Sequence, residues 1–272
     1  MGRNLVFGVW VVIWVVAVTS CSKFRKIQKS EDWRIKYDAG MNYYAKKDYY
    51  RTALLFEEIL PIVRGLPEGE KVEFALAYCQ YYEKQYLLSS NQFRTFFETY
   101  GRSAQAEEAY FMYAYSLYVV SPEANLDQTS SIEAMDAMQN FLNRYPSSEF
   151  REKASEVIVI SQQKLELKGY NNAKQYLKIR SYKAAVIAFN NFKKNYPDSR
   201  YLEELAYLKV VAEYKLALQS FHTLQVERYN DVVDYYQELV DNFPESMYLK
   251  EAEKMYSDSL SKLNKLKNNK NS

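Results

Sequence analysis

Apolar residues recur at helical spacing in the stretch YKAAVIAFNNFKKNYPDS, which runs from Tyr182 to Ser199. They lie three and four positions apart and therefore share one face of a helix. These residues are Tyr182, Ala185, Val186, Phe189 and Phe192. Pro197 should end the helix, because proline has no backbone N–H and disfavours helical geometry at the residue before it. The stretch predicts an amphipathic helix with a defined stop.

The same pattern recurs along the chain. Each copy begins with one residue, and the other positions are counted from it. A compact residue stands three positions later, a large apolar residue seven positions later and the helix-ending position fifteen positions later. The copies begin at Tyr49, Tyr86, Ser131, Tyr182 and Tyr229. The helix-ending residue is proline in the last three copies and Gly101 in the second, whereas the first copy fits only the first half of the pattern and has Arg64 in that place. An internal repeat of this kind decides the fold class.

A small residue stands nine positions before three of the copies, at Gly40, Ala77 and Ala173. Each copy is therefore read as the second helix of a pair, with the small residue where the two helices cross. This unit resembles the tetratricopeptide repeat over residues 35–246, although its intervals of 37, 45, 51 and 47 residues exceed the usual 34. A loop over residues 120–127 accounts for part of the excess. The expected fold is all-α, a right-handed α-solenoid of about five helix pairs, with residues 247–272 as a capping helix and tail.

The N-terminus has the pattern of a targeting segment. Arg3 precedes an uncharged apolar run from Leu5 to Val18, which is too short to span a bilayer and suits a signal-peptide core. The run ends in Val-Thr-Ser-Cys at Cys21, which resembles a lipobox. Residues 1–20 are therefore predicted to be a lipoprotein signal peptide, and residues 21–34 the lipidated cysteine and its tether. An uncleaved anchor with an incidental cysteine is the alternative.

The residues after Cys21 bear on localisation. Ser22 follows the cysteine where an inner-membrane lipoprotein of many diderm bacteria would have aspartate, so the pattern resembles that of outer-membrane lipoproteins. Residues 22–30 are basic and contain no acidic cluster, which favours the periplasmic leaflet over the cell surface. Cys79, the second of two cysteines, has no internal disulfide partner once Cys21 is lipidated, and we expect it to be a small buried residue.

Composition supports a helical, core-forming protein. Apolar residues make up 48% of the chain, while glycine (7) and proline (6) are scarce. The formal net charge of +2 gives no electrostatic reason to expect a nucleic-acid partner. The 27 tyrosines suit either the walls of a groove or an aromatic core, because tyrosine packs its ring and can keep its hydroxyl in water.

Little in the sequence suggests catalysis. The one histidine, His222, has no cysteine or carboxylate motif around it, and HExxH, GxSxG and glycine-rich phosphate loops are absent. Acidic pairs such as Glu107-Glu108 and Glu203-Glu204 fall at predicted helix starts, where carboxylates offset the helix dipole. We therefore predict no enzyme activity, no metal site and no cofactor other than the covalent lipid on Cys21.

A binding groove is the expected functional surface, since the first helices of tetratricopeptide pairs line a concave face. Counting on the helical wheel from Gly40, Ala77 and Ala114 predicts an aromatic strip across the first three pairs, with Glu108 among its charged positions. The predicted strip consists of Tyr37, Tyr44, Phe74, Tyr78, Tyr81, Phe111, Tyr115 and Tyr118. It would suit an extended peptide with aromatic side chains. The alternative is that these rings are inter-helix core.

The lipobox, the five pairs, the tether and the terminal helix together resemble the BamD-type (YfiO-like) family of outer membrane assembly lipoproteins. The resemblance covers nearly the whole chain. It implies a non-enzymatic adaptor, lipid-anchored on the periplasmic face of the outer membrane. Its N-terminal pairs would receive unfolded outer-membrane β-barrel proteins, and its C-terminal pairs would dock on the periplasmic domains of a BamA-like insertase. The alternative is a periplasmic tetratricopeptide scaffold that organises cell-wall or division enzymes.

Overall fold

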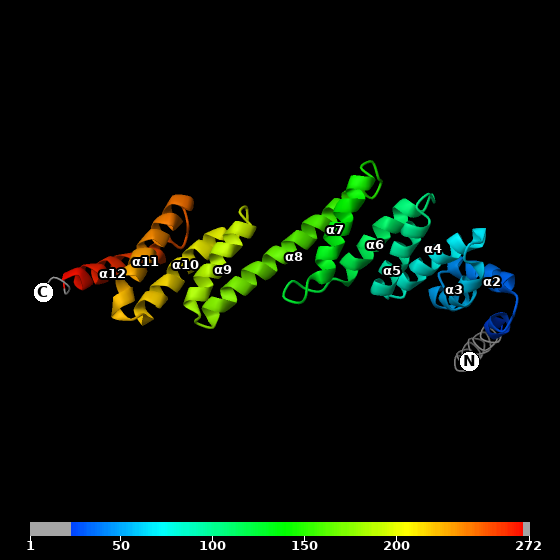
Figure 1. Cartoon of the computed structure of the whole chain (residues 1–272), viewed down its shortest axis with the longest axis horizontal. Helices are drawn as coiled ribbons and strands as arrows, with labels where there is room; N and C mark the ends of the chain where they lie inside the picture. The colour runs from blue at the N-terminus through cyan, green and yellow to red at the C-terminus, as the bar shows by residue number, and fades with distance from the viewer. Residues whose placement is uncertain (1–22, 269–272) are drawn as a thin grey trace, which may run out of the picture. The chain divides into compact units, whose positions relative to one another are not determined.

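The computed structural model describes residues 23–268, and in that part of the chain all regular secondary structure is helical (Figure 1). The helices are α2 (Trp33–Ala45), α3 (Tyr49–Val63), α4 (Pro67–Tyr82), α5 (Tyr86–Thr99), α6 (Ala106–Val120), α7 (Thr129–Arg144), α8 (Arg151–Lys178), α9 (Tyr182–Asn195), α10 (Leu202–Gln219), α11 (His222–Asn242) and α12 (Leu249–Asn268). Residues 23–28 are also helical.

Consecutive helices pack together in the predicted pairs, α2 with α3, α4 with α5, α6 with α7 and α10 with α11, and α12 follows as the predicted cap. The core residues of α9 and of the second half of α8 pack in one cluster and complete the fourth pair. The all-α tetratricopeptide-type fold expected from the repeat is therefore confirmed. The loop predicted between α6 and α7 is also present, because residues 121–128 are not helical.

The repeat signature specifies where the second helices end. Helices α5, α7, α9 and α11 each end two residues before the helix-ending position of their copy, at Gly101, Pro146, Pro197 and Pro244. The serine that follows then orders the turn, as Ser199 shows. Its Oγ accepts a hydrogen bond from the backbone N–H of Tyr201 at 3.1 Å and donates one to Glu166 at 2.5 Å. The signature is thus a helix stop followed by a serine that hydrogen-bonds within the turn before the next helix.

Small residues lie where the helices of a pair cross. Gly40, Ala77, Ala114 and Ala173 are all buried. Gly40 permits the closest approach, because a Cβ atom built there would lie 2.2 Å from Cε1 of Phe56. The burial of all four residues agrees with the prediction, and the close approach of Phe56 shows that α3 packs tightly on α2 at Gly40.

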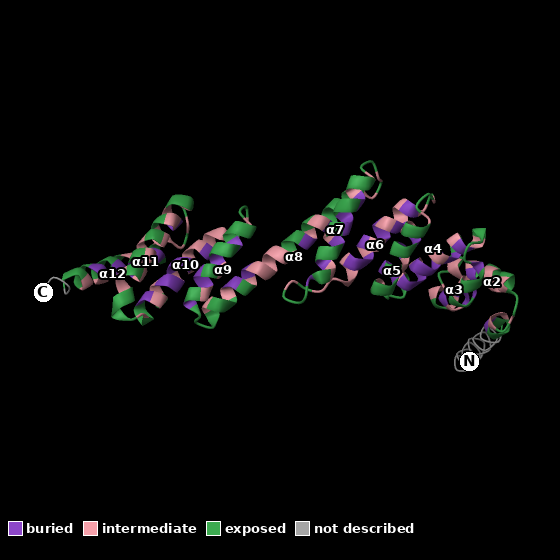
Figure 2. Ribbon diagram, viewed as in Figure 1, coloured by how far each residue is buried: buried purple, intermediate pink, exposed green. Residues whose placement is uncertain are grey.

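The described chain forms two compact units, each with its own core (Figure 2). The N-terminal unit contains residues 23–122 and 127–161, and its core is rich in aromatic side chains from α3 to α7. The C-terminal unit contains residues 123–126 and 162–268, so α8 contributes to both units. Cys79 is buried in the first core as a free thiol, as expected, and burial raises its pKa to about 12.

The predicted signal peptide and Cys21 lie outside the described residues. Close to them, Phe24 is buried and meets the ring of Tyr43 edge-on at 5.7 Å between centroids. None of the helices within residues 23–268 is both long and apolar enough to serve as a transmembrane span.

Candidate peptide-binding strip

The first helices of the three N-terminal pairs, α2, α4 and α6, carry the predicted aromatic strip. Six of its eight residues are half-buried, so each presents part of its ring to solvent: Tyr37, Tyr44, Tyr78, Tyr81, Tyr115 and Tyr118. The other two, Phe74 and Phe111, are 8% and 5% exposed and belong to the core beneath. The helical wheel therefore did not distinguish the half-buried tyrosines of these helices from the buried phenylalanines, and for Phe74 and Phe111 the alternative of inter-helix core holds.

Ring contacts join α4 to α6. Tyr81 on α4 lies 6.4 Å from Tyr115 on α6, and Tyr115 lies 5.7 Å from Tyr118, between ring centroids. Tyr115 also stacks on buried Phe111 at 5.4 Å. The buried phenylalanine thus supports a tyrosine that remains accessible, which fixes the orientation of the outer ring.

The connection from α4 to the first pair depends on Tyr82, which the wheel did not select. Tyr82 is 49% exposed and stacks on Tyr49 of α3 at 4.3 Å. Its ring lies 5.9 Å from Tyr78, while Tyr49 lies 6.0 Å from Tyr44. Tyr82 follows Tyr78 by four positions and therefore lies on the same face of α4, and this spacing was the available sequence signal.

One carboxylate lies within the strip. Glu108, in the first turn of α6, accepts a hydrogen bond from the hydroxyl of Tyr78. Burial and this carboxylate hold the pKa of Tyr78 far above its usual range, and burial also raises the pKa of Tyr44. Burial raises the pKa of Tyr81 to about 12. All three phenols therefore stay neutral at physiological pH. The Tyr78 proton is used on Glu108, whereas Tyr44 and Tyr81 can donate hydrogen bonds to a ligand.

This arrangement is suited to binding and not to bond making. Half-buried rings supply apolar area, and neutral phenols can donate to the carbonyl groups of an extended peptide. Within the described residues, no group of three or more His, Cys, Asp or Glu side chains is placed to hold a metal ion. His222 lies far along the chain at the start of α11 in the other unit.

Comparison with known proteins identifies relatives over most of the chain. The YfiO family, described as outer membrane lipoprotein, matches residues 31–227. A protein of Aquifex aeolicus (strain VF5) named as outer membrane protein assembly factor BamD is 29% identical over 209 residues, which are 76% of this chain and 68% of the relative. A BamD of Rickettsia prowazekii (strain Madrid E), with the same role in its name, is 23% identical over 212 residues, 78% of this chain and 80% of the relative.

Proposed function

This chain belongs to the YfiO family of outer membrane lipoproteins, and from that membership we propose that it is an assembly factor for outer membrane proteins. In this role it is a non-enzymatic adaptor. It binds unfolded β-barrel proteins and a BamA-type insertase and helps to insert barrels into the outer membrane. Both named relatives support the general role, and the aromatic strip of the N-terminal unit supports the binding of unfolded chains.

The strip is the observation that carries the peptide-binding part of the proposal. It places half-buried tyrosines on three successive first helices, α2, α4 and α6, and the hydroxyls of Tyr44 and Tyr81 can donate to a backbone. A β-barrel strand has alternating side chains and, while unfolded, unpaired carbonyl groups. The rings of the strip would contact every second side chain of such a segment. The phenol hydroxyls would donate hydrogen bonds to its backbone carbonyl groups. The C-terminal pairs are then available for the insertase.

Cys21 is the proposed site of lipid attachment. The lipobox-like sequence before it and the lipoprotein family to which the chain belongs both favour this assignment. A single acyl chain binds membranes only marginally, whereas several chains on one residue anchor a protein firmly. The anchored protein would lie on the periplasmic face of the outer membrane.

The test is a pull-down of the full-length protein from its own membranes in mild detergent, with identification of the co-purifying proteins. A stoichiometric large β-barrel protein with periplasmic repeats is the expected partner. Recovery of cell-wall or division enzymes without any barrel protein would overturn the proposal and favour the scaffold alternative. Mass measurement of the purified protein decides lipidation separately, because Cys21→Ser should remove the added lipid mass.

A further inference from the structure

One edge of the C-terminal unit is formed by three helix ends. They are the turn between α8 and α9 and the turn between α10 and α11, which lie on the same side of the unit (Figure 1), and the C-terminal part of α12, which packs against α10 and α11. Lys215 near the end of α10 lies 5.9 Å from the ring of Tyr182 at the start of α9. A small apolar cluster of Ala217, Tyr229 and Leu263 joins the ends of α10, α11 and α12.

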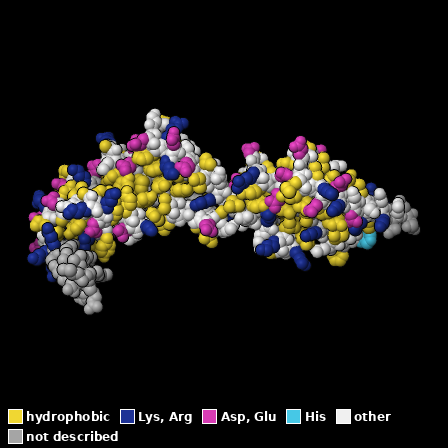
Figure 3. Space-filling model, turned by 180° about the vertical axis from the view of Figure 1, so that it is seen from behind, with side chains coloured by type: hydrophobic (Ala, Val, Ile, Leu, Met, Phe, Trp, Pro, Cys, Tyr) yellow, Lys and Arg dark blue, Asp and Glu magenta, His cyan; other side chains and the backbone are white. Residues whose placement is uncertain are grey.

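This edge is strongly basic. The three chain segments that form it are residues 175–185, 214–226 and 259–268, and together they contain no aspartate or glutamate. Their basic residues are Lys178, Arg180, Lys183, Lys215, Lys262, Lys265 and Lys267. Lys262 pairs with Asp258, but the other six form no ion pair within the described part of the chain. We call this surface the basic edge; dark blue side chains line it along the lower side of the unit in Figure 3.

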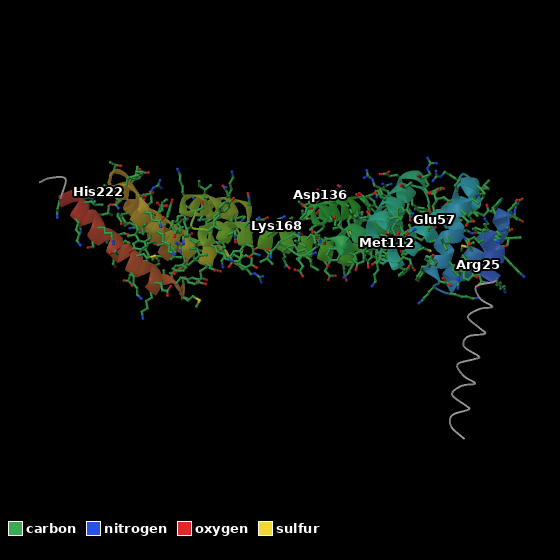
Figure 4. The ribbon with its side chains drawn as sticks, turned by 90° about the horizontal axis from the view of Figure 1, so that it is seen from below. Arg25, Glu57, Met112, Asp136, Lys168 and His222 are labelled. Atoms are coloured by element: carbon green, nitrogen blue, oxygen red, sulfur yellow. The ribbon has the colours of Figure 1, made fainter. Side chains whose placement is uncertain are left out.

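Large apolar side chains project from the same edge. Phe221, between α10 and α11, is 84% exposed, and Ile179, between α8 and α9, is 59% exposed. Leu218 and Leu224 on either side of Phe221 are 45% and 43% exposed. Figure 4 labels the neighbouring His222 beside the end of α12. Several exposed apolar side chains close together along the chain, as at Leu218, Phe221 and Leu224, are typical of an interaction surface.

From this combination we propose that the basic edge binds an anionic lipid surface, with Phe221 and its apolar neighbours entering the interface between headgroups and acyl chains. Lysines surrounding exposed aromatic and aliphatic side chains are the pattern of interfacial membrane binding, where each basic residue is attracted to anionic headgroups. Protein interfaces are instead depleted in lysine at their centres. Six of the seven basic residues here are lysines, so lipid fits better than an acidic protein.

The opposite edge of the same unit offers a natural comparison. It contains the turns α9–α10 and α11–α12. The first has mixed charge, with Lys193, Lys194 and Arg200 near Asp198 and Glu203, and the second is acidic, with Asp241 and Glu245. Met247 there is 81% exposed, nearly as exposed as Phe221, but it lies in an acidic setting. A membrane with negative charge should therefore attract the basic edge more strongly than the opposite edge, which orients the unit.

Vesicle binding tests the proposal. The chain beginning at Ser22 keeps every described residue and lacks the lipid anchor. Its co-sedimentation is measured with phosphatidylcholine vesicles and with vesicles containing about one third phosphatidylglycerol. We expect binding to the second kind, with an affinity that falls as salt is added. Phe221→Ser should weaken it at least about tenfold. It should leave the fold intact, because position 221 is the N-cap of α11 and serine is a favoured N-cap residue.

Two further variants complete the design. Lys178→Gln combined with Lys265→Gln and Lys267→Gln should also weaken binding at least about tenfold. Met247→Ser, at an equally exposed position on the opposite edge, should leave it unchanged. Equal loss in Met247→Ser, or no preference for anionic vesicles, would overturn the proposal. So would edge variants that bind vesicles normally but lose an acidic protein partner. Peptide binding by the N-terminal unit is measured separately, so neither result depends on the other.

Discussion

The hydroxyl of Tyr170 donates a hydrogen bond to the carboxylate of Glu204 at 2.5 Å, which ties α8 to the first turn of α10. The same relationship recurs in other pairs. Tyr78 of α4 bonds Glu108 in the first turn of α6, and Tyr207 of α10 bonds Glu251 in the first turn of α12 at 2.7 Å. First helices of successive pairs are thus linked by a tyrosine and a glutamate.

Tyr170→Phe tests what such a bond contributes. The substitution keeps the ring, which stacks on Tyr201 at 4.1 Å, and removes only the hydroxyl. Glu204 retains its ion pair with Lys174 at 2.7 Å, so we expect a loss of about 1 kcal/mol in the free energy of unfolding. Urea denaturation followed by circular dichroism measures it. Tyr176→Phe is the control, because the Tyr176 ring is 43% exposed and its hydroxyl has no hydrogen bond within the described residues.

The same carboxylate should make stability depend on pH. Burial alone would raise the pKa of Glu204, but hydrogen bonds from Lys174 and Tyr170 outweigh it and lower the pKa below the usual 4.5. A group with a lowered folded-state pKa stabilises the fold above its unfolded pKa and loses that contribution as pH falls. The stability difference between the wild type and Glu204→Gln should therefore shrink as pH is lowered through 4.5 and below. A difference that stays constant with pH would contradict this account.

Gly40 should not tolerate alanine. The added Cβ would overlap the ring of Phe56, whose Cε1 and Cδ1 atoms would lie 2.2 and 2.8 Å away. Phe56 is fully buried, so the ring cannot swing into solvent, and overpacking of this kind costs about 1–3 kcal/mol. Thermal melting measures the loss. Gly101→Ala is the matched control, because the nearest atom to its Cβ would be the carbonyl oxygen of Phe97 at 3.4 Å. Equal melting temperatures for both variants would show that α2 and α3 leave room for a Cβ atom at position 40.

The sequence was sufficient for features that depend on local spacing. The crossing glycine at position 40 and the stop at Pro197 follow from a repeat that needs no knowledge of the partner helix. The bond from Tyr170 to Glu204 could not be predicted in this way, because it joins residues 34 positions apart on different pairs. Such a bond depends on how far one first helix is shifted along its axis relative to the next. The length of the repeat interval does not determine that shift.

For the candidate strip, too, local spacing predicted some features and the packing of partner helices determined the others. Periodicity predicted which face of α4 carries Phe74 and Tyr78, but not how deeply each side chain is buried. Phe74 lies beneath because it contacts Phe93 at 6.0 Å and Phe96 at 5.1 Å, both from the paired helix α5. The acidic pairs were incompletely interpreted as well. Glu108 does lie in a first turn as predicted, but it also accepts the Tyr78 hydrogen bond.

A buried ion pair between α10 and α11 should respond differently to single and double substitution. The side chain of Glu213 is 2% exposed and lies 3.3 Å from Arg228. Burial raises the pKa of Glu213 despite the nearby guanidinium, so desolvation costs more than the pair returns. Glu213→Leu should destabilise by about 1–3 kcal/mol, because Arg228, with a side chain 19% exposed, then keeps only the longer ion pair with Asp231 at 3.7 Å. Combining Glu213→Leu with Arg228→Met should recover most of the lost free energy of unfolding, which a double-mutant cycle with urea denaturation measures. If the effects of the two single substitutions simply add in the double variant, the prediction is wrong.

The strip makes the most direct prediction about function. Tyr115→Ala and Tyr82→Ala remove accessible rings, so each should weaken binding of a peptide with a C-terminal aromatic residue about threefold to tenfold. Helicity and melting should change little, because both rings lie at the surface of the core. Phe111→Ala should instead lower the stability by about 3–5 kcal/mol, since that ring is 5% exposed and stacks on Phe150 at 4.5 Å.

Fluorescence anisotropy of a labelled peptide separates these effects. Tyr50→Ala is the matched control, because Tyr50 is 63% exposed on α3, outside the strip, and its removal should leave the affinity unchanged. If the variants at Tyr115 and Tyr82 melt early and bind in proportion to their folded fraction, the rings are structural and the strip is not the site. If they fold normally and lose affinity while Tyr50→Ala does not, peptide recognition depends on the accessible rings of the first helices. The buried phenylalanines then act as their support.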